Sequence, residues 1–135
     1  MSASLTATIR AANTALIDNG NLSAIAEFFA PDYTAHLTDG SMIGGHAAIR
    51  RFLSMLRRAF PQITIDVEIL VEGEDRVAWQ RTMRAVQEGP FHGFPASNRE
   101  IVWRDMVASR FDGDLIAEEW VVTDLAERLL LARKS

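Results

Sequence analysis

The sequence predicts an α+β domain in which helices pack on one face of a strongly curved antiparallel sheet. Apolar residues recur at helical spacing up to about residue 60, and from residue 63 onward they alternate with polar residues in the period-two pattern of strands. No internal repeat or linker divides the 135 residues, a length near the commonest size of one domain. We therefore expect a single domain over residues 1–135, with a cavity between the curved sheet and its helices.

The first sixty residues predict three helices and one short strand. The first helix covers about residues 4–18, a short second helix covers residues 22–29, and a long third helix covers residues 46–60. The apolar stripes of the first and third helices are formed by Leu5, Ile9, Ala12 and Leu16, and by Ile49, Phe52, Leu53, Leu56 and Phe60. Residues 32–37 are typical of a short strand between the second and third helices.

The second half of the chain predicts an antiparallel meander of four strands. They cover residues 63–71, 76–87, 100–111 and 115–124. The run Asp112-Gly113-Asp114 is a strong hairpin signal between the last two strands. Apolar residues after position 124 indicate one closing turn of helix.

Composition argues against several classes of function. The net charge of −4 and the pI near 5.3 argue against nucleic-acid binding, which requires a basic face. The chain has no cysteine, and its three histidines lack metal-ligand spacing, so no metal site is expected. It also has no run of 18 apolar residues that would span a membrane and no basic segment followed by an apolar run at its start, so a cytoplasmic location is expected.

Asp124 is the first candidate for a catalytic residue. Strand alternation places Trp120, Val122 and Asp124 on one face, so the carboxyl group would follow two apolar side chains into the interior. Desolvation raises the pKa of a carboxylic acid toward neutrality, as a general acid or base requires. The alternative is structural, because an Asp with Glu127 three residues later resembles the N-terminal cap of a helix.

Asp105 is the second candidate, on the strand that pairs with the one ending at Asp124. A two-residue hairpin turn would pair Trp103 with Asp124 and bring the carboxyl groups of Asp105 and Asp124 close enough to couple. A three-residue loop would instead place Arg104 opposite Asp124 and lower the pKa of the Asp124 carboxyl. Both arrangements remain open from the sequence.

Other side chains are expected to line the cavity. Tyr33 and His36 face opposite ways in a regular strand, so one of the two should reach it. Gln80 would hydrogen-bond a ligand carbonyl, or would face solvent or a second subunit. The apolar wall is expected to include Met55, Phe60, Trp103 and Trp120.

Val77, Trp79 and Met83 share one face of a predicted strand. If the helices cover the other face, these side chains need a partner, because an apolar sheet face of this size usually marks an association surface. We therefore expect a homodimer through the sheet. Glu118 is expected to pair with Arg110 across the last hairpin in a structural role.

Four segments, taken in order, carry a resemblance to a known family. They are Asp32-Tyr33-x-x-His36, Ala59-Phe60-Pro61, Gly89-x-Phe91-x-Gly93-x-Pro95-Ala96 and Ile116-x-Glu118-x-Trp120-x-x-x-Asp124. Together they resemble the SnoaL-like polyketide cyclase family of the nuclear transport factor two-like (cystatin-like) superfamily, over nearly the whole chain. The resemblance implies a cone-shaped α+β barrel with a deep pocket, usually a dimer, and, in the enzymes, acid–base chemistry without a metal or an organic cofactor.

Two positions depart from the family pattern. The family often has Gly-Thr-His before the glycine-rich loop, where this chain has Ala85-Val86-Gln87. The characterised cyclases pair their aspartate with a histidine on the preceding strand, and here Val107 is expected to face the pocket at that position. Both imidazoles are therefore missing, which puts polyketide ring closure itself in question.

The sequence thus supports three classes of function. The first is a cofactor-independent acid–base enzyme of the cyclase, isomerase, dehydratase or epoxide hydrolase type, with Asp124 as acid or base and Asp105 as a second carboxyl. Its substrate would be an apolar molecule that bears a carbonyl or an epoxide. The second is a module that binds a small apolar ligand without chemistry, and the third is a dimerisation domain whose cavity is filled by side chains.

Overall fold

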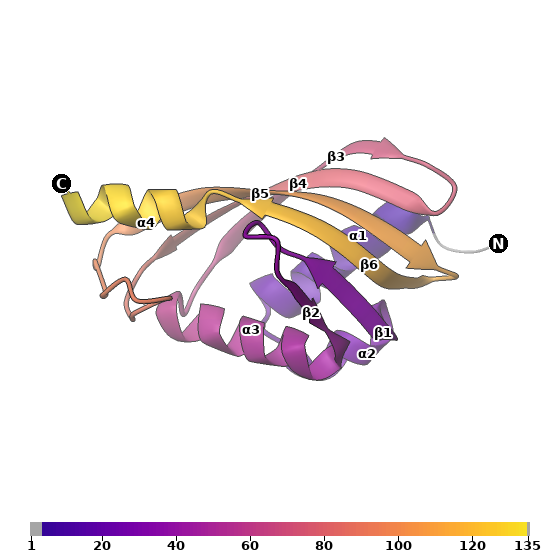
Figure 1. Ribbon diagram of the computed structural model, residues 1–135, viewed down its shortest axis with the longest axis horizontal. Helices are drawn as coiled ribbons and strands as arrows, with labels where there is room; N and C mark the ends of the chain where they lie inside the picture. The colour runs from indigo at the N-terminus through magenta and orange to yellow at the C-terminus, as the bar shows by residue number, and fades with distance from the viewer. Residues whose placement is uncertain (1–3, 135) are drawn as a thin grey trace.

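The computed structural model describes residues 4–134, in which helices cover the concave face of one six-stranded sheet with strand order β2-β1-β6-β5-β4-β3 (Figure 1). The helical elements are α1 (Leu5–Asn13), a π-helical turn (Thr14–Asp18), a 3-10 helical turn (Leu22–Ala24), α2 (Ile25–Phe28), α3 (Gly45–Ala59) and α4 (Leu125–Lys134). The strands are β1 (Phe29–His36), β2 (Met42–Gly44), β3 (Thr64–Glu72), β4 (Arg76–Val86), β5 (Glu100–Asp112) and β6 (Leu115–Thr123). None of the described helices is long and apolar enough to cross a membrane.

The helical stripes predicted from the sequence are largely buried. Ile9, Ala12 and Leu16 face the interior from α1 and its π-helical continuation, and Leu53 and Leu56 do so from α3. Burial of an aliphatic side chain stabilises a fold by roughly 1.5–3 kcal/mol relative to leaving it exposed. These stripes therefore dock the helices on the sheet.

Three elements differ from the prediction. The second helix ends at Phe28 and β1 begins at Phe29, so Pro31 lies inside a strand and not after a helix. A strand tolerates this proline because the pairing of β1 with β6 is interrupted between Phe29 and Thr34, where no ladder N–H is required. The short strand β2 was not predicted, and α4 has ten residues where one turn was expected.

The sheet is mixed and not purely antiparallel. Strands β3 to β6 form the predicted antiparallel meander, but β1 lies parallel to β6, with Ala35 opposite Glu119 and His36 opposite Trp120. The prediction of an antiparallel sheet is wrong at this edge, because hydrophobic alternation reports which face of a strand is buried and not which strand lies beside it.

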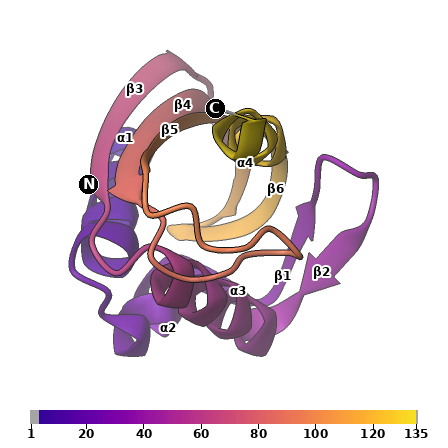
Figure 2. The ribbon, with the colours of Figure 1, turned by 90° about the vertical axis from the view of Figure 1, so that its left-hand side faces the viewer.

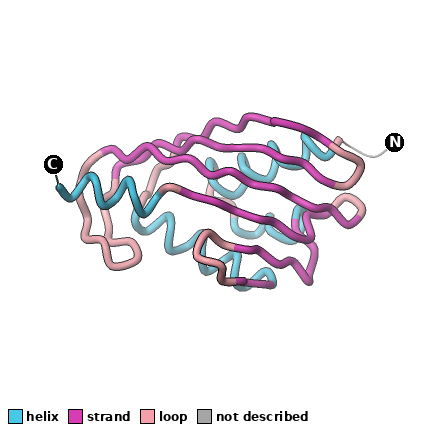
Figure 3. The backbone as a smooth tube through the Cα atoms, turned by 45° about the horizontal axis from the view of Figure 1, so that its top comes forward, coloured by secondary structure: helices cyan, strands magenta, loops and turns pink. Residues whose placement is uncertain are grey.

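The sheet curves strongly, and helices α1, α2 and α3 lie across its open side (Figure 2). Figure 3 shows the long strands running side by side, with α4 continuing from the end of β6. The sheet is not closed into a full barrel, since β2 and β3 form its two edges. The cone-shaped α+β fold expected from the resemblance is confirmed.

The apolar face of β4 looks toward the helices. Val77, Trp79 and Met83 are each 2 % exposed or less, and α1 packs against β3 and β4 on this face. The expectation that these three side chains face a second subunit is therefore wrong. Period-two alternation identified the apolar face but could not show on which side of the sheet the helices lie.

A β-bulge at Ala117 decides which side chains of β6 face inward. The hairpin has the expected two-residue turn, yet Arg110 pairs with Glu118 where an unbroken hairpin would pair it with Ala117. The extra residue reverses the alternation of every later residue in the strand. Glu119 consequently faces the concave side of the sheet, and Glu118 faces the convex side.

Candidate functional site

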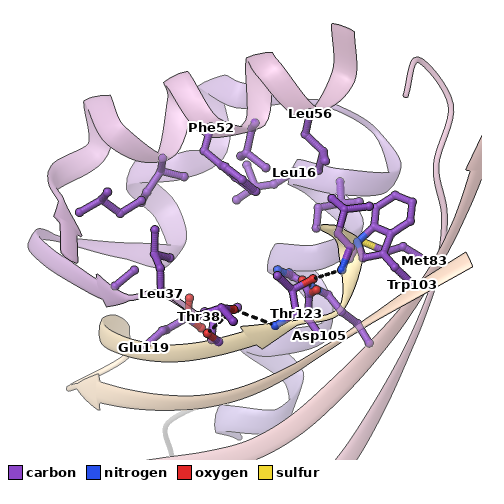
Figure 4. Close-up of a pocket in the computed structure, with 18 of the residues that line it drawn as sticks. Leu16, Leu37, Thr38, Phe52, Leu56, Met83, Trp103, Asp105, Glu119 and Thr123 are labelled. Carbon is purple, nitrogen blue, oxygen red and sulfur yellow. Dashed lines mark hydrogen bonds and ion pairs between the residues drawn. The ribbon is translucent and has the colours of Figure 1, made fainter. Parts of the chain in front are cut away.

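A cavity of about 410 Å³ lies between the concave face of the sheet, helices α1 and α3, and the loop over residues 87–99 (Figure 4). Its lining is mostly apolar, and Figure 4 shows Leu16 and Leu56 of the helical layer facing the sheet residues Met83 and Trp103. A cavity of this size lies within the range that binds small organic molecules. In such an apolar space, the few polar side chains determine how a ligand is oriented.

Asp105 is held in the cavity by an ion pair with Arg81. Nε of Arg81 donates to Oδ2 of Asp105 (2.9 Å), and Nη1 donates to Oδ1 of Asn13 on α1 (2.9 Å). The Asp105 side chain is 8 % exposed, and its Oδ1 has no hydrogen-bond partner among the described residues. A buried carboxylate oxygen without a partner is unfavourable, so this atom requires a donor from a ligand or a water molecule.

Glu119 is the second buried carboxyl group of the cavity. The Tyr33 hydroxyl donates to Oε1 (2.7 Å) and the Ser109 hydroxyl donates to Oε2, while Nε1 of Trp79 donates to the oxygen of Ser109 (2.9 Å). Burial raises the pKa of the Glu119 carboxyl and the charge of Asp105 adds to the rise, while the hydrogen bonds from Ser109 and Tyr33 oppose it. Glu119 therefore keeps its proton to a higher pH than an exposed glutamate does.

The Tyr33 hydroxyl remains protonated beside this carboxyl group. Burial raises the pKa of Tyr33 well above its ordinary value, and the charge of Glu119 raises it further. Tyr33 also lines the cavity, so its hydroxyl connects Glu119 to the space that a ligand would occupy.

Gln87 organises the loop over residues 87–99, which closes one side of the cavity. The side chain is 1 % exposed, its Nε2 donates to three carbonyl oxygens of the loop, and its Oε1 accepts from the backbone N of Ser97 (3.2 Å). The loop also approaches α3 closely, because a Cβ at Gly89 would lie 2.7 Å from the carbonyl oxygen of Arg58. Where the family often has histidine, this chain thus has an amide that holds the loop together.

Asp124 lies outside the cavity. Its Oδ1 accepts a hydrogen bond from the backbone N of Arg104 (2.8 Å), and its Oδ2 pairs with Nε of Arg128 in α4 (3.1 Å). The expected inward direction is wrong, because the bulge at Ala117 places Arg104 and not Trp103 opposite Asp124. Arg104 is the residue that a three-residue loop would have placed opposite Asp124, but here a bulge beyond a two-residue turn produces this pairing, and the partner is the backbone N–H of Arg104 and not its guanidinium. The carboxylate ties the start of α4 to β5.

Two of the aromatic residues predicted to line the cavity do so, namely Trp103 and Tyr33. Phe60 is fully buried behind Trp103, with ring centroids 4.7 Å apart. Met55 is half-buried on α3 and Val107 is buried in β5, and neither they nor Phe60 belong to the lining of this cavity. Phe60 and Val107 belong to the hydrophobic core instead, and Met55 belongs neither to the core nor to the cavity lining.

His36, Trp120 and Gln80 lie on the convex face of the sheet, away from the cavity. The rings of His36 and Trp120 stack at 5.1 Å, and Nε2 of His36 lies 2.7 Å from Oε2 of Glu118. Arg110 donates to the other oxygen of Glu118 (3.0 Å), the pairing expected from the sequence. The hydrogen bonds from His36 and then Arg110 lower the pKa of Glu118. Gln80 is bonded to a carboxylate of β3 on the same face.

Arg81 and Glu119, which carry most of the polar chemistry in the cavity, were not predicted. Glu119 was missed because its direction depends on the bulge. The only sequence signal for this bulge is that two consecutive residues, Ile116 and Ala117, are apolar, and both are buried in the structure. Arg81 was missed because it shares the face of Trp79, which was assigned to the outside. Among residues 4–134, no group of three or more histidine or acidic side chains is placed to hold a metal ion.

The fold and the site define a class: a cone-shaped α+β protein with a small-molecule cavity whose polar groups are buried. The profile of the SnoaL-like polyketide cyclase family matches residues 7–130. The chain therefore belongs to this family, as the sequence motifs indicated.

Solved structures of the same fold include three proteins with similar lengths. IdmH from Streptomyces antibioticus, a proposed polyketide cyclase, is 23 % identical with a TM-score of 0.81. The match covers 97 % of this chain and 99 % of IdmH. A proposed polyketide cyclase from Acidithiobacillus ferrooxidans is 23 % identical with a TM-score of 0.83, and the match covers 99 % of this chain and 97 % of that protein. AclR from Streptomyces galilaeus, a proposed hydroxylase, is 24 % identical with a TM-score of 0.81, and the match covers 97 % of this chain and 82 % of AclR. At these identities the similarity shows the fold. Comparison with curated proteins found no match.

Proposed function

We propose that this protein is a cofactor-independent acid–base enzyme that moves a proton on a small apolar substrate bearing a carbonyl or an epoxide. The observation that carries the proposal is the burial of two carboxyl groups, Asp105 and Glu119, in one apolar cavity with different partners. Proton transfer without a cofactor requires one group that accepts a proton and another that donates one. A carboxyl group paired with Arg81 and a second one that accepts from two hydroxyl groups could divide these two roles.

Asp105 is the proposed base. Arg81 provides a positive charge at Oδ2, and Oδ1 has no partner among the described residues. Oδ1 has less than 1 Å² of exposed surface, so the carboxyl group would have to rotate to present this atom to a ligand. The apolar surroundings strengthen the interaction of this charge with a substrate proton, since little water competes.

Glu119 is the proposed acid, acting through Tyr33. Burial raises the pKa of Glu119, so the carboxyl group retains a proton that an exposed glutamate would lose. The Tyr33 hydroxyl lies 2.7 Å from Oε1 and also lines the cavity. It would donate its proton to the substrate and take one from Glu119, which leaves the tyrosine uncharged at the end of the step.

Solvent deuterium uptake tests the proposal without knowledge of the natural substrate. Small apolar ketones would be incubated with the protein in deuterated buffer, and loss of hydrogen at the carbon beside the carbonyl would be followed by proton NMR. We expect uptake above the buffer rate for the wild type and a fall of at least tenfold for Asp105→Asn and for Glu119→Gln.

The matched control is Glu118→Gln, which changes the neighbouring glutamate on the convex face and should keep the wild-type rate. Uptake that is unchanged in both Asp105→Asn and Glu119→Gln contradicts the proposed roles. Ketones that bind without any uptake support the alternative function, a binding module on the same fold.

We also propose that the convex face of the sheet forms a homodimer interface. Leu70, Met106 and Val122 are 46 %, 51 % and 62 % exposed there, and Met106 pairs directly with Val122. Exposed apolar side chains grouped in this way favour association. Light scattering at micromolar concentration should give a dimer mass for the wild type and a monomer mass for Met106→Glu/Val122→Glu, and a monomeric wild type contradicts the interface. The dimer and the cytoplasmic location expected from the sequence both stay predictions.

A further inference from the structure

Arg81 has hydrogen-bonding capacity that no described protein group uses. Its Nε is bound to Asp105, its Nη1 is bound to Asn13, and its guanidinium carbon lies 5.3 Å from the centre of the Trp79 ring. No described residue accepts a hydrogen bond from Nη2. Among the described residues, only Oδ1 of Asp105 is a side-chain nitrogen or oxygen that is both buried and without a partner. Since Nη2 has no partner either, it must have exposed surface. Nη2 is therefore accessible, and Arg81 is one of the residues that line the cavity.

The position of the Arg81 guanidinium is fixed before any ligand arrives. Two hydrogen bonds and the ring of Trp79 hold the planar group, so binding a ligand costs little additional side-chain entropy. Of the described residues that line the cavity, Arg81 is the only arginine or lysine. A hydrogen bond from a cation in an apolar space is stronger than one between neutral groups. Arg81 is thus placed to determine where a ligand oxygen lies.

The charges around Arg81 favour a ligand oxygen that is neutral before reaction. Asp105 already pairs with this arginine, and Glu119 keeps its proton as the proposed acid, so the cavity carries no excess positive charge. A ligand carboxylate would add another negative charge to this desolvated site, which is costly. A carbonyl oxygen accepts the same hydrogen bond without that cost.

We infer that Nη2 of Arg81 binds the carbonyl oxygen of a neutral ketone and stabilises the negative charge that develops on it when Asp105 removes a proton from the adjacent carbon. In this step the C–H bond breaks, its electron pair forms the C=C bond of an enolate, the carbonyl π pair moves to oxygen, and the proton goes to Asp105. Reprotonation reverses these movements. A fixed cation aimed at the developing oxyanion lowers the barrier of such a step. The inference rests on the proposed function and narrows its substrate class to carbonyl compounds.

A pair of probes of equal shape tests the oxygen contact by binding alone. Methyl naphthyl ketone and isopropenylnaphthalene differ in having C=O or C=CH₂ at the same place, and their binding would be followed by the fluorescence of Trp79 and Trp103. We expect the wild type to bind the ketone about tenfold more tightly than the hydrocarbon, the size of one hydrogen bond to a charged group. A wild type that does not bind the ketone more tightly overturns the inference, whether or not either probe binds.

Variants assign the preference to Arg81. Because Arg81→Met alone would leave Asp105 buried without its cation, the test uses Arg81→Met/Asp105→Asn, in which we expect the ratio of the two affinities to fall to about one. Asp105→Asn alone retains an amide oxygen that can accept from Nε of Arg81, so it should keep the preference. Arg84→Met, which removes an exposed arginine of the same strand, should also keep it. A double variant that keeps the preference overturns the inference. The ratio of the two affinities does not depend on the folded fraction of the sample, because both probes bind the same folded protein.

The two proposals fail separately. A ketone preference that depends on Arg81, without deuterium uptake, contradicts the enzyme and leaves the oxygen contact standing. Deuterium uptake that depends on Asp105, without any ketone preference, overturns the role of Arg81 and leaves the proposed proton transfer standing.

Discussion

The hydroxyl group of Tyr33 donates a hydrogen bond of 2.7 Å to Oε1 of Glu119 inside the cavity. The parallel pairing of β1 with β6 sets these strands side by side, and the bulge at Ala117 turns Glu119 toward the concave face. Two non-local features of the sheet therefore produce one contact between a phenol and a buried carboxyl group. Burial raises the pKa of the proposed acid, and this contact opposes the rise.

Replacing Tyr33 with phenylalanine should raise the pKa of Glu119 further. The Tyr33 hydrogen bond stabilises the ionised carboxyl group, so its loss favours the protonated form. Carbon-detected NMR titration of labelled glutamate would measure the change, with Glu119→Gln used to assign the resonance. A pKa that falls or stays constant in Tyr33→Phe would show that the hydroxyl is not the donor.

The stability of the fold should depend on pH through Glu119. Its folded-state pKa lies above the ordinary value of 4.5, so the folded state binds more protons than the unfolded state between those two values. The contribution of Glu119 is therefore fully present below about pH 4.5 and is lost as pH rises to its folded pKa. Each tenfold difference in proton affinity between the two states corresponds to about 1.4 kcal/mol.

Urea unfolding of wild type and Glu119→Gln across this pH range tests the sign. We expect the wild type to lose stability relative to Glu119→Gln as the pH rises. The control, Glu118→Gln, should show the opposite direction, because the pKa of Glu118 is lowered and its contribution is lost as the pH falls. A difference between wild type and Glu119→Gln that does not vary with pH contradicts the prediction.

Asp124→Ala should weaken the fold and leave proton transfer intact. The substitution removes the acceptor for the backbone N of Arg104 and the partner of Arg128, at a cost of about 1 kcal/mol, typical for a residue at a helix start. Urea unfolding measures the loss, and Asp124→Asn, which keeps an acceptor oxygen, should lose less. Deuterium uptake that disappears in a folded Asp124→Ala protein would instead restore the catalytic role expected from the sequence.

Gln87→Ala should destabilise the protein far more than Gln80→Ala. The buried Gln87 amide satisfies several partly buried backbone groups of the loop, so its loss removes these hydrogen bonds together at a cost of about 2 kcal/mol. Gln80 is bonded to an exposed carboxylate, and its loss should cost less than about 0.5 kcal/mol. Chemical unfolding of both variants makes the comparison, and equal losses would show that the amide does not hold the loop.

Much of the fold could be predicted because it depends on local patterns. The stripe that includes Ile9 and Leu16, the end of α3 near Pro61 and the antiparallel meander all follow from hydrophobic period and backbone restriction. Strand β2 could not be predicted in this way, since its three residues are held by pairing with β1 and carry no pattern of their own.

By itself, the sequence determined the α+β class, the family, the apolar interior and the place of Asp105 among the candidate groups. Only the tertiary structure decided which polar groups meet in the cavity. Because of the bulge at Ala117, Glu119 and not Glu118 faces the cavity. Because α1 packs on the face of β4 that carries Trp79 and Arg81, both side chains lie inside. The physical reason is that a one-residue change of register reverses every later side chain of a strand, while its cause lies in packing between segments far apart in the chain.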